Sequence, residues 1–412
     1  MLYDNVVAPV QMKMEMISVG RRGILLLPEQ TSLLKNDSTA FARKARVSNR
    51  STYQVYFSSG TTGAPKAYQV PTDVVPVSVV QSSATPWNPP DQKKEERLLI
   101  VLPLVHNFAV IASYIALYRG HTLVTLPRFA AEKFLYTMEK YQVTHTFLVP
   151  PLVNFLANDE LVDKYDLSHL HSVVSGAAPL PPSTAEKCKK RLGLKDMRQC
   201  YGMTEVRICT WTPYGHANFT AIGVPVPGVV VKFVNPDNEK TVTKPYEHGE
   251  LWVSGPQTGG EYFDNESANK HTFVVDSGIT WCKTGDIGYF DEAGYLYLTD
   301  RHKDLIKFKG LQVSPSEIEA VLRDHPDVAD CAVIGKPDEH AGEVPVAFVK
   351  RRNSTLTSET LKQLVKSRLS SFKQLAGGVV FVDELPRSNT GKILKRELRA
   401  MLPQHLLVNA KL

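Results

Sequence analysis

The sequence predicts an α/β fold with a large N-terminal domain, built on a parallel sheet and a β-rich subdomain, and a small α+β C-terminal domain. Three observations lead to this prediction. Apolar segments of strand length alternate with helical segments from residue 98 onward, short strands and turns dominate after Tyr214, and a charged module of mixed pattern begins at Arg301. Alternating strands and helices are typical of a parallel sheet covered by helices. A chain of 412 residues also exceeds what one hydrophobic core normally supports.

The parallel sheet is predicted from the spacing of apolar residues. Runs of four to eight apolar residues indicate buried strands, and longer periodic runs indicate helices. Prolines open the last of the predicted helices and Gly193 closes it. We expect strands over 98–104, 121–127, 144–150 and 170–178, and helices over 108–120, 130–142, 152–165 and 181–193.

The apolar stretch 98–118 is nearly long enough to span a bilayer. Pro103, His106 and Asn107 interrupt its middle, however, and polar groups are costly in lipid. We therefore expect a buried strand, a turn at 104–107 and a buried helix, and no transmembrane segment.

The β-rich subdomain is expected at about 215–300 and completes an N-terminal domain of residues 1–300. Its strands are predicted within 228–238, 249–255 and 286–300, the last being a hairpin that turns at 291–294. The C-terminal domain, 301–412, follows a boundary at 300–303. It is expected to contain helices over 314–326, over 357–369 and from residue 393, and strands over 330–337 and 345–351.

Composition excludes several classes of protein. Lysine and arginine number 48 against 42 acidic residues, and no block of like charge stands out, so nucleic acid is not an expected partner. The five cysteines form no CxxC pair, which disfavours a disulfide framework or a zinc site and favours a reducing compartment. The N-terminus lacks the apolar core of a signal peptide.

The segment "YFSSGTTGAPKAYQV", residues 56–70, has the composition of a phosphate-binding loop. Its glycines and lysine do not have the spacing of a P-loop. Glycines nevertheless allow backbone N–H groups to converge on an anion, and hydroxyls and a lysine add donors. A Ser/Thr/Gly-rich linker is the alternative. The predicted phosphate ligands are Ser58, Ser59, Gly60, Thr61, Thr62, Gly63 and Lys66.

Three further motifs accompany this loop: "QCYGMTE" at 199–205, "TGDIGYFDEAGYLYLTDRHKDLIKFKG" at 284–310 and "PRSNTGKILKREL" at 386–398. Together, in this order, they resemble the adenylate-forming superfamily, which contains acyl-CoA synthetases, coumarate–CoA ligases and beetle luciferases. The resemblance covers roughly 53–398. The segments "LPLVHNFAV" and "VSGAAPLP" are most similar to the coumarate-ligase and luciferase branch.

This resemblance implies an ATP-dependent ligation in two steps, with Mg²⁺ and coenzyme A as cofactors and a small carboxylic acid as substrate. Thr204 would donate to the α-phosphate and Glu205 would bind Mg²⁺, although a glutamate can also begin a helix. Tyr201 would stack on adenine, and Gly202 would let the substrate approach the backbone. Asp286 would bind both ribose hydroxyls with support from Arg301; the alternative is that Asp286 is a turn residue.

In the same resemblance, Lys392 stabilises the negative charge of the adenylation transition state and sits on a mobile C-terminal domain. The domain would pivot at or beside Lys303, bringing Lys307 and Gly310 to the thiol entrance for the second step. His106 would gate the acyl pocket, unless it is an ordinary buried histidine. The expected pocket walls are His106, Asn107, Phe108, Ser175, Gly176, Ala177, Gly202 and Met203, of which Gly176, Ala177, Gly202 and Met203 are also assigned to the nucleotide.

Several alternatives stay open at this point. The acid can be cinnamate-like, fatty or a branched hydroxy acid, and Arg207 can meet a polar substrate group or a surface carboxylate. Because 55 residues precede Tyr56, we expect the first α/β subdomain to be incomplete. A non-catalytic, nucleotide-binding remnant and an adenylation domain that loads a carrier protein are therefore alternative functions.

The C-terminal residues Ala410, Lys411 and Leu412 are a conservative variant of the Ser-Lys-Leu peroxisomal address. They predict recognition by the peroxisomal import receptor and localisation in peroxisomes.

Overall fold

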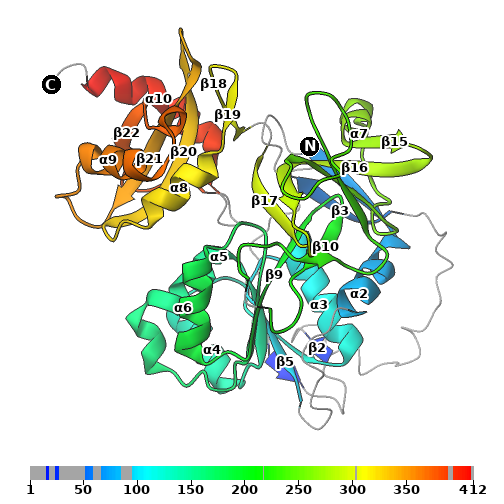
Figure 1. Cartoon of the computed structure of the whole chain (residues 1–412). Coiled ribbons are helices and arrows are strands. Elements are labelled where there is room, and N and C mark those ends of the chain that lie inside the picture. Colours follow the sequence, from blue (N-terminus) through cyan, green and yellow to red (C-terminus); the bar gives the residue numbers. More distant parts are fainter. Residues whose placement is uncertain are drawn as a thin grey trace, which may run out of the picture.

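The computed structural model describes residues 15–17, 24–26, 52–58, 66–84, 95–216, 218–301, 304–387 and 393–409. It has a large mixed α/β N-terminal part and a smaller C-terminal part, and the predicted fold class is confirmed (Figure 1). Near the N-terminus, β1 (Glu15–Ile17) and β2 (Ile24–Leu26) form an antiparallel pair.

The largest sheet of the described residues has seven strands. Strands β5 to β9 are parallel to one another, and β10 and β11 add an antiparallel edge. The strands, in pairing order, are β11 (Val224–Pro225), β10 (Arg207–Trp211), β9 (Asp196–Met203), β8 (Ser172–Ser175), β7 (His145–Leu148), β5 (Arg97–Ile100) and β6 (Thr122–Thr125).

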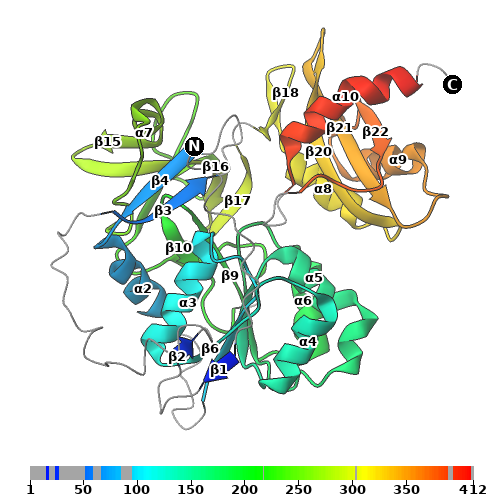
Figure 2. The same cartoon turned by 180° about the vertical axis from the view of Figure 1, so that it is seen from behind.

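Helices cover both faces of this sheet, as the alternation of apolar segments predicted (Figure 2). Successive strand residues point to opposite faces, and β5 shows this directly. Leu98 packs in the core beneath α3, whereas Leu99 packs in the core beneath α4, α5 and α6. The helices are α3 (Asn107–Arg119), α4 (Ala131–Lys140), α5 (Pro150–Asn158) and α6 (Pro182–Leu192).

The predicted helix over 152–165 is shorter than expected. It ends at Asn158, where Asp159 adopts extended backbone and its side chain accepts a hydrogen bond from the N–H of Leu161 at 2.9 Å. This cap begins a separate 3₁₀ helix, η3 (Glu160–Lys164), because aspartate competes for backbone N–H groups. The sequence also failed to predict α2 (Val74–Ala84), whose many valines favour strands.

Two further sheets complete the N-terminal part. A β-rich sheet contains β12 (Val230–Val234), β13 (Gly249–Ser254), β16 (Ile279–Phe290), β15 (Phe273–Asp276) and β17 (Leu296–Arg301). Its β16–β17 hairpin turns at the predicted position, 291–294. The other sheet, of three described strands, contains β14 (Glu261–Tyr262), β4 (Lys66–Pro71) and β3 (Thr52–Ser58); α7 (Glu266–Thr272) follows β14.

The C-terminal part has its own sheet and two apolar cores. Helices α8 and α9 pack on one face and α10 packs on the other. The strands are β19 (Leu311–Val313), β18 (Ile306–Phe308), β21 (Gly342–Arg351), β20 (Val328–Asp338) and β22 (Gly378–Phe381), and the helices are α8 (Pro315–Arg323), α9 (Ser358–Arg368) and α10 (Lys395–Asn409). The predicted helices and strands of this part are confirmed.

The stretch 98–118 forms β5, a turn and α3, as expected. Within the described part of the chain, every helix is too short or too polar to cross a membrane.

We predict that Ile318→Ala destabilises the C-terminal core by about 2–5 kcal/mol, since the Ile318 side chain of α8 is fully buried in that core and its truncation leaves a cavity. Urea unfolding followed by circular dichroism measures the change. Ile279→Ala is the matched control, because Ile279 is 46% exposed and should change stability by less than about 1 kcal/mol. Equal losses in the two variants would contradict the assigned packing.

Candidate functional site

The candidate site lies where the parallel strands β8 and β9 end at their carboxyl termini. Strand β9 carries Tyr201, Gly202 and Met203 and turns at 204–206 into β10. A Cβ atom on Gly202 would lie 1.8 Å from the carbonyl oxygen of Arg207, so glycine is required for this tight hairpin. The structure therefore provides a reason for Gly202 that is independent of substrate approach.

Tyr201, Asp286 and Arg301 form one polar cluster. The hydroxyl of Tyr201 donates to Oδ2 of Asp286 at 2.6 Å, and Nε of Arg301 lies 3.1 Å from Oδ1 of the same carboxylate. Asp286 and Arg301 are directly paired on β16 and β17, so the register of the hairpin brings them together. Asp286 lies within a strand, and the interpretation as a turn residue is wrong.

The charges in this cluster shift the pKa values of its members. Burial raises the pKa of Tyr201 well above its usual value, and the carboxylate of Asp286 adds to the shift. Burial acts to lower the pKa of Arg301, but the charges around it, first that of Asp286, raise its pKa overall. Tyr201 is thus a neutral donor and Arg301 a permanent cation.

Glu205 lies in the turn between β9 and β10, so the interpretation as a helix N-terminal residue is wrong. It is only 4% exposed. The hydroxyl of Tyr262 donates to its Oε1, and the hydroxyl of Tyr68 donates to its backbone carbonyl at 3.1 Å. Burial raises the pKa of Glu205, while the hydrogen bond from Tyr262 and the charges of Arg301 and Lys66 oppose that rise.

The hairpin formed by β3 and β4 contains the predicted phosphate loop. Ser58 and Lys66 are paired at the end of this hairpin, and residues 59–65, which include Ser59, Gly60, Thr61, Thr62 and Gly63, lie outside the described residues. The ammonium of Lys66 lies 5.4 Å from the ring centre of Tyr262. Tyr262 therefore contacts both Lys66 and Glu205, and joins the phosphate hairpin to the β9–β10 turn.

The expected walls of the acyl pocket lie close to this turn. Asn107 and Phe108 begin α3, and His106 is its N-cap residue, half-buried, with a pKa that burial lowers. A Cβ atom on Gly176 would lie 2.9 Å from the Phe108 ring and from Sγ of Cys200, so glycine allows close packing there. Ala177 has a φ of 70°, a rare conformation for a residue with a side chain.

Two further wall residues, Ser175 and Met203, lie at the ends of β8 and β9.

Arg207 is buried, so the alternative of a surface carboxylate as its partner is wrong, and a contact with a polar substrate group stays a prediction. The residue is 1% exposed, its Nη1 donates to Oδ1 of Asn107, and the centre of its guanidinium lies 5.1 Å from the ring centre of Tyr56. Burial lowers the pKa of Arg207. It is a buried cation that links α3 to β3 and β10.

The predicted residues of the C-terminal part are placed only in part. Lys307 is exposed on β18, and its backbone N–H donates to Oε2 of Glu343 at 2.9 Å. Gly310 is in the β18–β19 turn with a φ of 79°. Lys392, Lys303 and the residues 410–412 lie outside the described residues.

Comparison with known families agrees with this arrangement. The model of the AMP-binding enzyme matches residues 10–263, and the model of the AMP-binding enzyme C-terminal domain matches residues 317–392. The chain belongs to the AMP-binding enzyme family. The resemblance drawn from the four motifs is therefore confirmed.

Relatives in this family have several activities. Luciferin 4-monooxygenase of Photuris pensylvanica is 38% identical over 353 residues, which are 85% of this chain and 64% of the relative. Probable 4-coumarate–CoA ligase 3 of Dictyostelium discoideum is 35% identical over 352 residues, 83% of this chain and 62% of the relative. The chain thus spans slightly less than two thirds of these AMP-binding enzymes.

A solved structure in the same family is similar as well. The o-succinylbenzoate coenzyme A synthetase of Bacillus subtilis, in complex with ATP and a magnesium ion, superimposes with a TM-score of 0.74 at 31% identity, over 85% of this chain and 70% of that chain.

Sequence reasoning missed Tyr68 and Tyr262. Both are buried, and both donate hydrogen bonds to Glu205 although they come from β4 and β14. The sequence offers only a weak signal for Tyr262, which lies two residues after the glycine pair Gly259–Gly260. A Cβ on Gly260 would lie 2.3 Å from the carbonyl oxygen of Gln69 and 2.5 Å from the Tyr68 hydroxyl.

We predict that Glu205→Gln becomes progressively more stable than the wild type as the pH rises above about 4.3, the ordinary pKa of glutamate. A carboxyl group with a raised folded-state pKa binds more protons in the folded chain, so its contribution to stability falls as pH rises through that pKa. The glutamine variant does not lose stability in this way. In the wild type the loss is at most about 1.4 kcal/mol per pH unit.

Urea unfolding of both proteins between pH 4 and pH 8 measures the difference. Glu266→Gln is the control, since the Glu266 side chain is 80% exposed and its surface ion pair with Lys270 should contribute little to stability. A difference between Glu205→Gln and the wild type that stays constant with pH would show that burial does not raise this pKa.

Proposed function

We propose that the chain is an ATP-dependent carboxylic acid–CoA ligase that forms an acyl-adenylate and then an acyl-CoA thioester. The observation that carries the proposal is the convergence of Tyr201, Asp286, Arg301 and Glu205 at the carboxyl end of β9, beside the hairpin that carries Lys66. Ligands of open α/β sheets bind at this edge. Membership of the AMP-binding enzyme family supports the same assignment.

In the first step, a carboxylate oxygen of the acid attacks the α-phosphorus of ATP, and the bond to the β-phosphate breaks to release pyrophosphate. Asp286 accepts hydrogen bonds from the ribose hydroxyls, and Arg301 holds the Asp286 carboxylate in place. The hydroxyl of Tyr201 donates to Asp286, and this bond holds the ring that we propose to stack on adenine. Thr204 donates to the α-phosphate, and Lys66 with the 58–63 segment binds the β- and γ-phosphates.

Glu205 is the residue proposed to hold Mg²⁺, and the residues present fit such an ion. Mg²⁺ usually takes one or two protein carboxylates together with substrate phosphates and water. Glu205 supplies one buried carboxylate beside the phosphate hairpin, and its raised pKa shows that the site disfavours an uncompensated negative charge. When bound, the ion supplies charge neutralisation between the phosphates.

In the first step, Lys392 contacts both the carboxylate of the acid and the α-phosphate, and its positive charge stabilises the negative charge that develops there. In the second step the C-terminal domain rotates near Lys303, and Lys307 and Gly310 approach the thiol of coenzyme A. The thiolate sulfur attacks the acyl carbon, and AMP leaves. The 4-coumarate–CoA ligases among the relatives support coenzyme A as the acceptor.

The proposed substrates are aromatic or medium-chain carboxylic acids of lipid or secondary metabolism. His106, Phe108 and Gly176 are the proposed pocket walls, and the close contact of Gly176 with the Phe108 ring leaves an apolar boundary. A planar or elongated chain fits such walls better than a compact polar acid.

The central experiment is pyrophosphate release by the purified chain with ATP, Mg²⁺ and a panel of cinnamic, medium-chain and branched hydroxy acids. We expect release with at least one acid, and consumption of coenzyme A in proportion. ATP binding without pyrophosphate release across the panel favours the non-catalytic remnant. Transfer only to a carrier protein favours the carrier-loading alternative.

The variant Lys392→Ala tests whether Lys392 acts in the first step and not in the second. We expect acyl-adenylate formation to fall by about 10²-fold or more, because one preorganised cation at developing charge contributes a factor of that size. Thioester formation from supplied acyl-adenylate should stay within about twofold of the wild type. Arg396→Ala, on the exposed start of α10, is the matched control. Equal loss of both steps contradicts the role of Lys392.

We further propose that Ala410, Lys411 and Leu412 direct the chain to peroxisomes. A fluorescent protein fused to the N-terminus should co-localise with a peroxisomal marker, and deletion of the three residues should abolish this. A cytosolic distribution of the intact fusion contradicts the proposal.

A further inference from the structure

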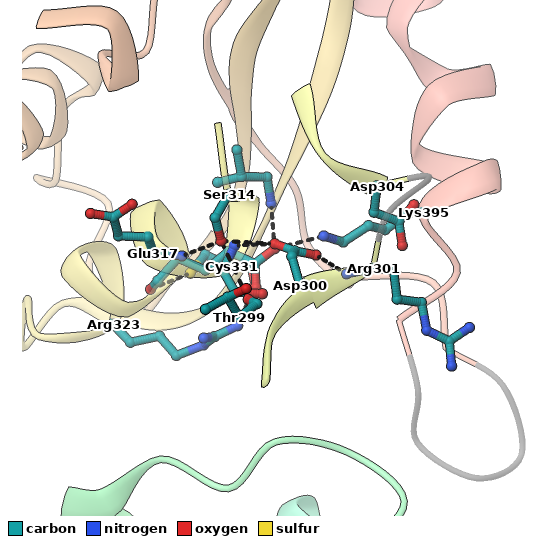
Figure 3. A network of polar contacts seen from close by, with 12 residues as sticks. Thr299, Asp300, Arg301, Asp304, Ser314, Glu317, Arg323, Cys331 and Lys395 are labelled. Atoms are coloured by element: carbon teal, nitrogen blue, oxygen red, sulfur yellow. Dashed lines mark hydrogen bonds and ion pairs between the residues drawn. The ribbon is translucent and has the colours of Figure 1, made fainter. Parts of the chain in front are cut away.

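The end of β17 presents two charged side chains to opposite sides. Arg301 points to Asp286 in the candidate nucleotide site, at 3.1 Å. Its neighbour Asp300 must point the other way, because successive strand residues face opposite sides. Figure 3 shows that Asp300 contacts the C-terminal part of the chain.

Asp300 binds the N-terminus of α8. Its Oδ2 accepts hydrogen bonds from Oγ of Ser314 at 3.0 Å and from the backbone N–H of Ser316 at 2.9 Å. Ser314 is the N-cap of this helix, and its Oγ accepts from the N–H of Glu317 at 3.4 Å. A carboxylate at a helix N-terminus also interacts favourably with the helix dipole. Asp300 thus acts as a second cap, provided from a strand of the N-terminal part.

A second helix is held in the same region (Figure 3). Nζ of Lys395, at the start of α10, lies 3.3 Å from Oε1 of Glu319, and both side chains are largely buried. The charges of Glu319, Asp300 and Asp304 raise the pKa of Lys395 although burial acts to lower it. Arg399 on α10 pairs with Asp304 at 3.3 Å. The charge of Asp300 therefore acts on α8 and on α10.

We propose that Asp300 is a positioning residue that holds the C-terminal domain in the orientation of this structure, by binding the N-terminus of α8 beside Lys395. The proposal deepens the proposed function: it names the contact that couples the nucleotide site to the domain that carries Lys392. Arg301 and Asp300 are adjacent at the end of β17, so the residue that pairs with Asp286 and the residue that caps α8 share one strand end.

The contact is specific to one orientation of the domain. The predicted pivot at Lys303 lies between Asp300 and Ser314, and rotation there moves α8 while β17 stays with the N-terminal sheet. Asp300 would then lose both hydrogen bonds to Ser314 and Ser316. The contact therefore stabilises one orientation only, and a contact shifts a two-state equilibrium only if it favours one state over the other.

The experiment measures domain orientation directly. All five native cysteines are buried, so thiol-reactive dyes label surface cysteines selectively. Glu186→Cys on α6 and Lys366→Cys on α9 replace exposed side chains, and they place one dye on each domain. Single-molecule energy transfer then reports the distribution of inter-domain distances in the otherwise wild-type chain and in Asp300→Ala.

We expect Asp300→Ala to reduce the ratio of the dominant to the minor distance population by about tenfold, the effect of losing one hydrogen-bonded charge. Asp300→Asn, which keeps an acceptor for Ser316 but loses the charge, should give a smaller change in the same direction. Asp324→Ala, at the opposite end of α8 and paired with the exposed Arg368, should leave the distribution unchanged.

A distance distribution of Asp300→Ala identical to that of the wild type would overturn the proposal. An unaltered melting temperature for Asp300→Asn confirms that the shift does not arise from unfolding. The two half-reactions give a second readout: Asp300→Ala should change their rate ratio, whereas a purely structural role lowers both rates equally. If the wild type releases no pyrophosphate, the proposed function fails, while the distance measurement still tests the role of Asp300.

Discussion

The rest of the site depends on the pairing of the Asp286 carboxylate with Tyr201 and Arg301. The carboxylate binds the Tyr201 hydroxyl on β9 of the parallel sheet and the Arg301 guanidinium on β17 of the β-rich sheet. A carboxylate that is only 7% exposed is costly unless it is paired, so these bonds fix the relative position of two sheets. The candidate nucleotide site lies at the junction that this pairing creates.

Glu205 connects the β9–β10 turn to the third sheet, formed by β14, β4 and β3, in a similar way. Its buried carboxylate receives a hydrogen bond from Tyr262 on β14, and its carbonyl receives one from Tyr68 on β4 of the phosphate hairpin. The ammonium of Lys66 lies over the ring of Tyr262, so the same tyrosine contacts both the cation and the carboxylate. Electrostatic catalysis requires such preorganisation, since charges that must move into place lose most of their effect.

The two domains are connected by a different kind of contact. Within each domain the described core is apolar, whereas Asp300 joins them through hydrogen bonds to a helix N-terminus and through the field around Lys395. A small polar contact can be broken at modest cost, which would suit the change in domain orientation that we propose.

The sequence by itself determined the alternation of strands and helices, the hairpin at 291–294 and the family, because these depend on local periodicity, turn residues and short motifs. It predicted a site containing Tyr201, Glu205, Asp286 and Arg301, and the structure brings these four together. Only the tertiary structure decided that Tyr262 and Tyr68 bind Glu205, that Arg207 is buried against Asn107, and that Asp300 caps α8. These partners are far apart in the chain, and such contacts arise from packing and strand register, which no local pattern records.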